Sequence, residues 1–294
     1  TGPVPDREDV VGLPPSLDGD RVARDVYRFI NELEPEALEA IGERLEFRGA
    51  DATFSRMRDA YLDELPLGSA RTVLDVGCGT GVEARALLAR PDFVGRVVAL
   101  DQSPALLERA RRLATEELVQ ERLDLVVGDA HRLEAGDGAF DVVIAHTLVS
   151  HLADPPMALR EMARVIRPGG TVAVFDGDYA SWTWSHPDPV LAAAMDEGFR
   201  SAVVANPRVM REMPSLLREA GLKLVAAQAS VYAETGTGRF FPAAAETYGP
   251  IIAGAGAVSA ADVERWLVGL RRALDERTFF AACNYYACLA ERPR

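Results

Sequence analysis

Short apolar runs alternate with longer amphipathic stretches through the middle of this 294-residue chain. Runs rich in Val, Leu and Ile predict buried strands over 73–76, 96–101, 123–129, 140–146 and 171–176. Apolar residues recur at helical spacing between most of these runs. Strands that alternate with helices indicate a parallel sheet covered by helices.

Further apolar stripes at helical spacing lie outside this alternating region. Three of them occur within 20–65 and predict three amphipathic helices before the first strand. After the fifth strand, the pattern predicts helices over 188–205 and 207–220, and strands over 222–232 and 278–289.

The last two predicted strands are separated by about 45 residues, far more than a hairpin loop needs. This separation, with a helix predicted from Ser259 to Asp275, indicates an insert. We therefore interpret the chain as a mobile lead over 1–19, a helical cap over 20–66 and a main domain over 67–294 with a cap insert over about 235–275.

The first strand of the alternating region runs directly into a glycine turn. The sequence is Val73-Leu-Asp-Val-Gly-Cys-Gly-Thr-Gly81, and helix-forming residues begin at Val82. A strand, a tight glycine turn and a helix start form a nucleotide pocket at the carboxyl edge of a parallel sheet. No Lys-Ser/Thr pair follows, so this is not a P-loop, and Val82 stands where the dinucleotide fingerprint places Gly or Ala.

The charge and the cysteines of the chain narrow the choice of partner. A net charge of −13 argues against nucleic acid and against an anionic membrane surface. No apolar run approaches the ~18 residues of a membrane span. Cys78, Cys283 and Cys288 are widely spaced, which fits a reducing cytoplasm and offers neither a disulfide framework nor a zinc site. We expect a cytoplasmic protein with a small-molecule partner, and a homodimer is left open.

The glycine turn resembles the first motif of class I S-adenosylmethionine-dependent methyltransferases. A later phrase, Leu159-Arg-Glu-Met-Ala-Arg-Val-Ile-Arg-Pro-Gly-Gly170, is also typical of that family. The resemblance covers roughly 70–289 and is closest to the ubiquinone/menaquinone-biosynthesis and natural-product small-molecule groups. It implies an α/β Rossmann-like, doubly wound sheet of seven strands with an antiparallel last strand. It also implies S-adenosyl-L-methionine as cofactor, with S-adenosyl-L-homocysteine as product.

The candidate cofactor ligands follow the carboxyl ends of the strands. Asp101 ends the second strand about 20 residues after the glycine turn, where a carboxylate can accept from both ribose hydroxyls. The resemblance implies that Asp129 accepts from the adenine amine and that the backbone beside it meets a ring nitrogen. The full set of candidates is Asp75, Gly77, Cys78, Gly79, Gly81, Asp101, Gln102, Asp129, Ala130 and His146.

Histidine is the candidate base, because its ordinary pKa lies near neutrality. All four histidines are expected just after the third, fourth and fifth strands, and His131 among them is interpreted as structural. The catalytic candidates are His151 and Asp178, and the acceptor-binding candidates are Tyr179, Trp182 and His186. A metal site is not adopted, because the spacing of these histidines and aspartates is not diagnostic.

These features predict methyl transfer to a small organic acceptor, with the acceptor atom left open. The fourth strand continues into His-Thr-Leu-Val-Ser-His, unlike the Asn/Asp-Pro-Pro-Tyr/Phe motif of enzymes that methylate amino groups of DNA or glutamine side chains. One alternative keeps the fold and cofactor but performs cyclisation or decarboxylation. A nicotinamide oxidoreductase is disfavoured by Val82, and a binding module without activity is disfavoured by the intact cofactor motifs.

Overall fold

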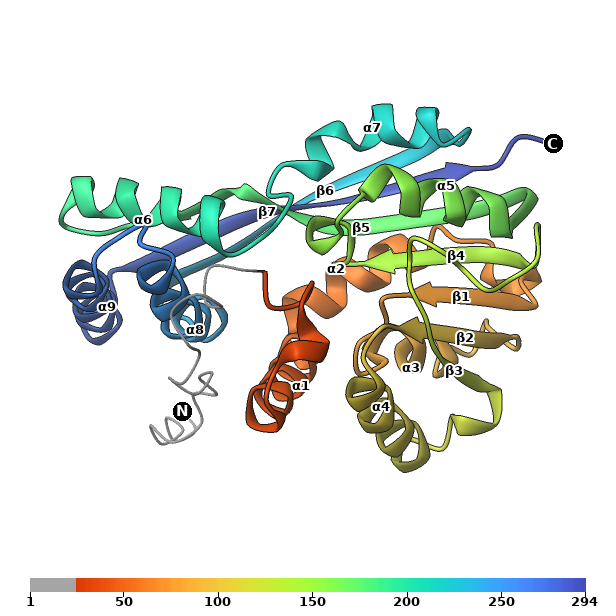
Figure 1. The fold of residues 1–294 in the computed structure, drawn as a ribbon, viewed down its shortest axis with the longest axis horizontal. Coiled ribbons are helices and arrows are strands. Elements are labelled where there is room, and N and C mark those ends of the chain that lie inside the picture. The colour runs from red at the N-terminus through yellow and green to blue at the C-terminus, as the bar shows by residue number, and fades with distance from the viewer. Residues whose placement is uncertain (1–24) are drawn as a thin grey trace.

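A seven-stranded sheet lies at the centre of the computed structural model (Figure 1), which describes residues 25–294. The strand order is β3-β2-β1-β4-β5-β7-β6, and β7 runs antiparallel to both of its neighbours, β5 and β6. The strands are β1 (Thr72–Val76), β2 (Arg96–Asp101), β3 (Leu123–Val127), β4 (Phe140–His146), β5 (Ile166–Trp184), β6 (Lys223–Gly236) and β7 (Phe279–Glu291). The predicted parallel sheet with an antiparallel last strand is confirmed. The lead predicted over 1–19 lies outside the described residues.

The fifth strand is longer than the predicted 171–176. It continues to Trp184 because β7 pairs with it on both sides of an irregular stretch, from Asp176↔Tyr286 to Asp178↔Asn284 and again from Thr183↔Ala282 to Trp184↔Ala281. The predicted end of this strand at residue 176 is therefore wrong, and the candidates Asp178 and Tyr179 lie within β5 rather than after it. A ladder partner about 100 residues away in the sequence decides the length of this strand.

Nine α-helices surround the sheet in the described part of the chain. They are α1 (Pro35–Ala50), α2 (Ala52–Leu62), α3 (Val82–Leu88), α4 (Pro104–Glu116), α5 (Pro155–Val165), α6 (Pro189–Ala202), α7 (Val209–Glu219), α8 (Phe240–Gly254) and α9 (Ala260–Asp275). Helix α4 begins with Pro104, a favoured first residue of a helix, and the Ser103 hydroxyl caps it by accepting from the Leu106 amide. Helix α5 ends at Val165, before the Arg-Pro-Gly-Gly sequence.

Between residue 25 and the first strand, the structure forms two α-helices rather than the three predicted from the apolar stripes of 20–65. The first stripe, within residues 25–33, forms turns and a short 3-10 segment, Ile30–Glu32. Glu34 is extended, with φ −67° and ψ 154°. Proline at the next position disfavours helical backbone at Glu34, so α1 starts afresh at Pro35.

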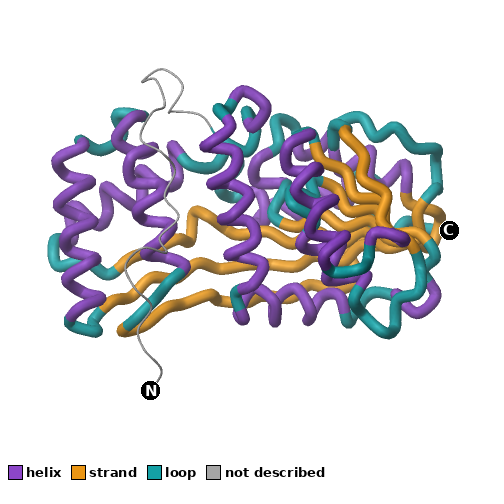
Figure 2. Tube along the Cα trace, turned by 90° about the horizontal axis from the view of Figure 1, so that it is seen from below, coloured by secondary structure: helices purple, strands orange, loops and turns teal. Residues whose placement is uncertain are grey.

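Helices cover both faces of the sheet (Figures 1 and 2). One buried apolar cluster joins the sheet to α2, α3, α4, α6, α8 and α9, and the other joins it to α5 and α7. Strands β5, β7 and β6 extend past the other four, and α6, α8 and α9 lie at this extension (Figure 1). The segment predicted as an insert thus forms α8 and α9 beside the extended strands.

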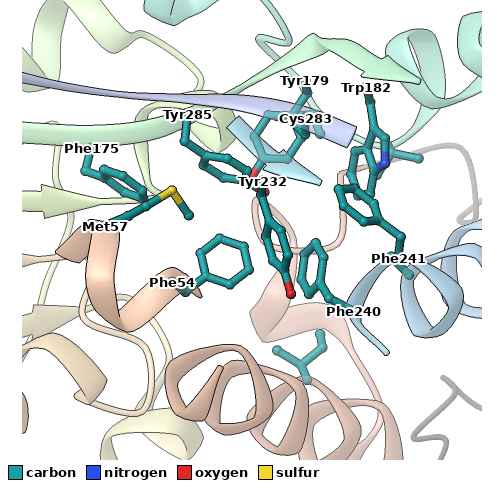
Figure 3. Packing of buried hydrophobic residues seen from close by; sticks show 14 of the residues in the cluster. Phe54, Met57, Phe175, Tyr179, Trp182, Tyr232, Phe240, Phe241, Cys283 and Tyr285 are labelled. Atoms are coloured by element: carbon teal, nitrogen blue, oxygen red, sulfur yellow. The ribbon is translucent and has the colours of Figure 1, made fainter. Parts of the chain in front are cut away.

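An aromatic cluster ties α2 and α8 to the sheet (Figure 3). The ring of Phe54 on α2 meets Phe240 of α8 edge to face at 4.9 Å and Tyr285 of β7 at 5.2 Å. These large buried rings supply much of the apolar burial that holds the added helices in place.

Candidate functional site

A cavity of about 340 Å³ lies at the carboxyl ends of β1 to β4. Its walls include the residues that follow these strands, together with Tyr27 to Ile30 and the α1 residues Leu45 and Arg48. The carboxyl edge is where ligands bind in doubly wound sheets, and the volume suits a small molecule. Helices α8 and α9 contribute no residue to this lining in the described part of the chain.

The glycine turn forms one wall of the cavity and requires glycine on geometric grounds. Gly77 and Gly79 have φ values of 72° and 54°, in the left-handed region. A Cβ at Gly77 would lie 2.5 Å from Leu148 Cδ1, and one at Gly79 would lie 2.9 Å from Leu45 Cδ1. The turn is held to β2 because the amides of Gly77 and Cys78 both donate to the Leu100 carbonyl.

Asp101 is fixed beside this turn at the end of β2. One carboxylate oxygen accepts from the Gly79 amide at 2.8 Å, and the other accepts from the Ser103 amide at 2.8 Å. Burial raises the pKa of Asp101. Each oxygen keeps a second lone pair, so the carboxylate can accept from a pair of hydroxyls in the cavity.

The next residue, Gln102, connects the cavity rim to the N-terminal segment. Its side-chain amide donates to the Tyr27 carbonyl at 2.9 Å, and the Asn31 side chain donates to the Gln102 carbonyl at 2.9 Å. The segment that precedes α1 is therefore attached across the edge of the cavity.

Asp129 and Ala130 follow β3 and line the cavity. One Asp129 oxygen accepts from the His131 amide at 2.8 Å and lies 2.7 Å from His131 Nδ1. Nε2 of the same ring accepts from the Asp154 amide at 3.2 Å. His131 therefore carries its proton on Nδ1 and holds the Asp129 carboxylate in place.

His146 is the last residue of β4 and is buried. Its ring stacks on Phe175 at 4.4 Å, its Nδ1 lies 3.0 Å from the Tyr61 hydroxyl, and its Nε2 lies 3.4 Å from Glu83. Burial lowers the pKa of His146 to about 4. The imidazole is neutral at pH 7, with both nitrogens directed at protein groups.

This buried histidine predicts a pH-dependent loss of stability. The unfolded ring has a pKa near 6.5 and the folded ring one of about 4, so between these values the unfolded state binds more protons. The free energy of unfolding should fall by about 3 kcal/mol from pH 7 to 4 through this group alone. Urea titrations at each pH measure the free energy of unfolding. Between pH 7 and 4 this free energy should fall by about 3 kcal/mol less in His146→Gln than in wild type. Equal declines in the two proteins would contradict the assignment.

His151 lies in a short 3-10 segment, Val149–His151, and lines the cavity. Its Nδ1 is 2.8 Å from an Asp25 carboxylate oxygen, and Tyr27 packs against its ring at 4.5 Å. The buried Asp25 carboxylate also accepts from the amides of Tyr27 and Ala205. Among the residues that the structure describes, Nε2 of His151 has no hydrogen-bond partner.

Other residues selected from the sequence lie outside the cavity lining. Asp75 is buried beneath the glycine turn, and Gly81, with φ 77°, precedes α3. Asp178 accepts from Arg211 Nε at 2.9 Å. The remaining three are Tyr179, whose ring is 6.3 Å from His151, Trp182, which stacks on Trp184, and His186, which lies against Gly269 of α9.

Sequence reasoning missed the cavity residues Tyr27, Arg48 and Thr147, and Asp25 behind His151. No local motif marks them, because Asp25 and His151 are 126 positions apart and Arg48 and Thr147 are 99 apart. Over residues 25–294, no three His, Cys, Asp or Glu side chains gather as a metal site would require. Within the same range, no helix has the length and apolar character of a membrane span.

Residues 74–174 match the family model described as a methyltransferase domain. An uncharacterised 37.1 kDa protein in transposon TN4556 of Streptomyces fradiae is 31% identical over 239 residues, which cover 80% of this chain and 66% of that protein. The 27-O-demethylrifamycin SV methyltransferase of Amycolatopsis mediterranei is 33% identical over 175 residues, covering 58% of this chain and 60% of that enzyme. The chain thus spans less than two thirds of the length of either relative.

Solved structures share the fold. The YcgJ protein of Bacillus subtilis superposes with a TM-score of 0.57 at 19% identity, covering 82% of this chain and 99% of that one. At this identity the likeness establishes the Rossmann-like architecture and nothing about the ligand.

Proposed function

The chain belongs to the class I S-adenosylmethionine-dependent methyltransferases, and on this premise we propose that it transfers a methyl group to a small organic acceptor. The proposal rests on the residues that line a single cavity. The glycine turn, the Asp101 carboxylate and the His151 imidazole all line it. This arrangement supports a cofactor site and a base that share one cavity.

The residues present fit the cofactor. Glycine at 77 and 79 leaves room that a Cβ would fill, and Asp101 has free lone pairs beside the turn. Asp101 would accept from the ribose hydroxyls, and Asp129 with the Ala130 backbone would meet the adenine. The cofactor roles of Asp75, Cys78, Gly81, Gln102 and His146 remain predictions. When bound, S-adenosylmethionine supplies an electrophilic methyl group.

The proposed base is His151, with Asp25 as its positioning residue. Asp25 accepts from Nδ1–H, so the lone pair of the neutral ring is on Nε2. The same carboxylate stabilises the imidazolium that forms when Nε2 takes a proton from a phenol or amine acceptor. The segment that carries Asp25 and Tyr27 also covers the cavity rim, which excludes water from the transfer.

The acceptor side of the site stays a proposal. Tyr179 is the candidate nearest the base, with its ring beside His151. Asp178 is bound to Arg211, and Trp182 and His186 lie along or beyond the extended strand. Their catalytic or acceptor-binding roles remain predictions, and β5 would be the element through which they act.

Replacement of Asp101 by Ala should weaken binding of S-adenosylhomocysteine roughly 10- to 100-fold, because two charge-assisted hydrogen bonds to the ribose are lost. Calorimetry measures the change. Asp124→Ala is the control, since Asp124 is an exposed carboxylate on β3 that pairs with Arg96. Equal affinities in wild type and Asp101→Ala would remove the ribose assignment.

Mass spectrometry tests the reaction itself. Metabolites incubated with the protein and S-adenosylmethionine should include one that gains a methyl group. An acceptor that is cyclised or decarboxylated, with the cofactor bound and unchanged, would favour the alternative reaction on the same fold. No binding of S-adenosylhomocysteine would exclude both.

We also propose a cytoplasmic location, which the three free, buried cysteines support. A homodimer would pair through β6, the outer strand of the sheet, where Val225 and Val231 are 47% and 65% exposed. The cap proposed over 20–66 and 235–275 would act on the cavity through α1. Helix α8 contacts α1 where the Arg44 guanidinium lies over the Tyr248 ring at 4.2 Å.

A further inference from the structure

The loop between α6 and α7, residues 203–208, contacts both members of the pair proposed as the base and its positioning carboxylate. The Ala205 amide donates to an Asp25 carboxylate oxygen at 3.0 Å. The next residue, Asn206, binds the short turn that carries His151. One stretch of backbone therefore holds the carboxylate and the turn of the base at the same time.

Asn206 binds this turn through its side chain and through its backbone. The side-chain Nδ2 donates to the Leu152 carbonyl at 2.7 Å and to the Ser150 carbonyl at 3.3 Å. The backbone amide of Asn206 also donates to the Ser150 carbonyl, at 2.8 Å. Ser150 and Leu152 are the residues on either side of His151, so the asparagine fixes the chain on both sides of the imidazole. The two N–H donors of one amide suit a pair of carbonyls, which a carboxylate of the same shape would repel.

The turn has a second anchor in the sheet. The Ser150 amide donates at 3.0 Å to a carboxylate oxygen of Asp176, a buried residue of β5. This bond fixes the turn to the sheet, whereas Asn206 fixes the turn to the loop that also binds Asp25. The distance of 2.8 Å between His151 Nδ1 and the Asp25 carboxylate therefore depends on the loop as well as on the sheet.

The loop is itself fixed by its surroundings. The Pro207 carbonyl accepts from the Ala180 amide of β5 at 3.0 Å. Val203 and Val204 are buried in the apolar cluster that includes α6 and α8. A loop that is anchored at several points can hold a functional group in place, as the residues that support a catalytic side chain must do.

We propose that Asn206 is a positioning residue for the base. Through the turn it keeps Nδ1–H of His151 on the Asp25 carboxylate, which leaves Nε2 as the nitrogen that can take a proton. A displacement of about 1 Å in a reacting group can cost roughly 10²-fold in rate, so loss of the Asn206 hydrogen bonds should affect the reaction through the position of the imidazole. The inference rests on the proposed function, because it needs His151 as the base.

The test uses an isosteric variant, a truncation and a matched control. Asn206→Asp keeps the shape of the side chain and replaces its two N–H donors by an oxygen, and Asn206→Ala removes the group. The control is Gln228→Ala on β6, the outer strand of the sheet, where the side-chain amide donates to the Ala60 carbonyl at 3.1 Å. Thermal unfolding shows whether each variant is folded.

Nuclear magnetic resonance of protein with isotope-labelled histidine shows which ring nitrogen carries the proton and how fast that proton exchanges with water. The His151→Ala variant identifies the signals of His151 among those of the four histidines. Wild type and Gln228→Ala should show a slowly exchanging proton on Nδ1 of His151, because this proton is hydrogen-bonded to Asp25. Both Asn206 variants should lose this slow exchange.

Kinetics use the acceptor that gains a methyl group in mass spectrometry. Both Asn206 variants should lower kcat roughly 10- to 100-fold, with KM and the affinity for S-adenosylhomocysteine within about twofold of wild type. A residue that only stabilises the fold would lower Tm and leave the His151 signal and the kcat of the folded protein unchanged.

Slow exchange at Nδ1 that persists in both Asn206 variants, or a kcat equal to that of wild type in both, would overturn the proposal. Loss of slow exchange in Gln228→Ala would overturn it as well. If no metabolite gains a methyl group, the proposed function fails, and the resonance experiment still decides whether Asn206 positions His151. If Asn206→Asp is unfolded, Asn206→Ala, which adds no charge, decides.

Discussion

Replacement of His151 by Ala should lower turnover by roughly 10²- to 10⁴-fold and leave the affinity for S-adenosylhomocysteine unchanged. The ring lies in the cavity with its Nδ1 on Asp25, so its other nitrogen is the available base. Steady-state kinetics across pH, with calorimetry for the cofactor product, measures both quantities. Any dependence of turnover on pH that comes from this base should disappear with the imidazole.

Asp25→Asn is the matched test of positioning, because it keeps the size of the side chain and removes its charge. An amide no longer stabilises the imidazolium and can donate to Nδ1, which favours the proton on Nε2 and blocks the base. Turnover should fall with little change in KM. An acceptor that arrives already nucleophilic would give a smaller loss in His151→Ala, and the pH profile would be flat in wild type. If His151→Ala leaves turnover and its pH profile unchanged, His151 is not the base, and the catalytic residue should be sought among Asp178, Tyr179 and His186.

Gly79→Val should abolish binding of S-adenosylhomocysteine while the sheet stays folded. At φ 54° a β-branched residue is strained by about 1–3 kcal/mol, and its Cβ would lie 2.9 Å from Leu45 Cδ1 at the cavity wall. The same change disturbs the amide that donates to Asp101. Calorimetry should detect no binding, and far-ultraviolet circular dichroism should match wild type.

Gly256→Val is the control for this change. Gly256 has φ 70°, and a Cβ at this position would meet no other part of the described chain within 4 Å, so the variant carries the backbone strain without the contact. It should lose similar stability and keep wild-type affinity. Wild-type affinity in Gly79→Val would show that the turn does not border the ligand.

Local patterns alone determined the nucleotide-binding half of this protein. The runs that became β1, β2 and β4 are apolar and buried over most of their length, and such runs have few alternatives to a central strand. The glycine turn, the Ser103 cap and the acid at the end of β2 are likewise contiguous in the chain. Their conformations depend on neighbours a few residues away, so the sequence predicts them.

Contacts between segments that are far apart in the sequence decided the remaining features of the fold and of the site. The length of β5 follows from its ladder with β7, so Asp178 and Tyr179 lie within the strand and not after the end that the sequence predicts. The 3-10 segment before Pro35 and helix α8 took their places by packing. Helix α9 follows Ser259 as the sequence predicts, and its place beside α8 depends on packing. The contacts of Asp25 with His151 and of Arg48 with Thr147 exist only in the folded chain. The sequence therefore predicts where the cofactor would bind and selects His151 as the base, whereas the partners of these side chains depend on tertiary contacts between residues about 100 positions apart.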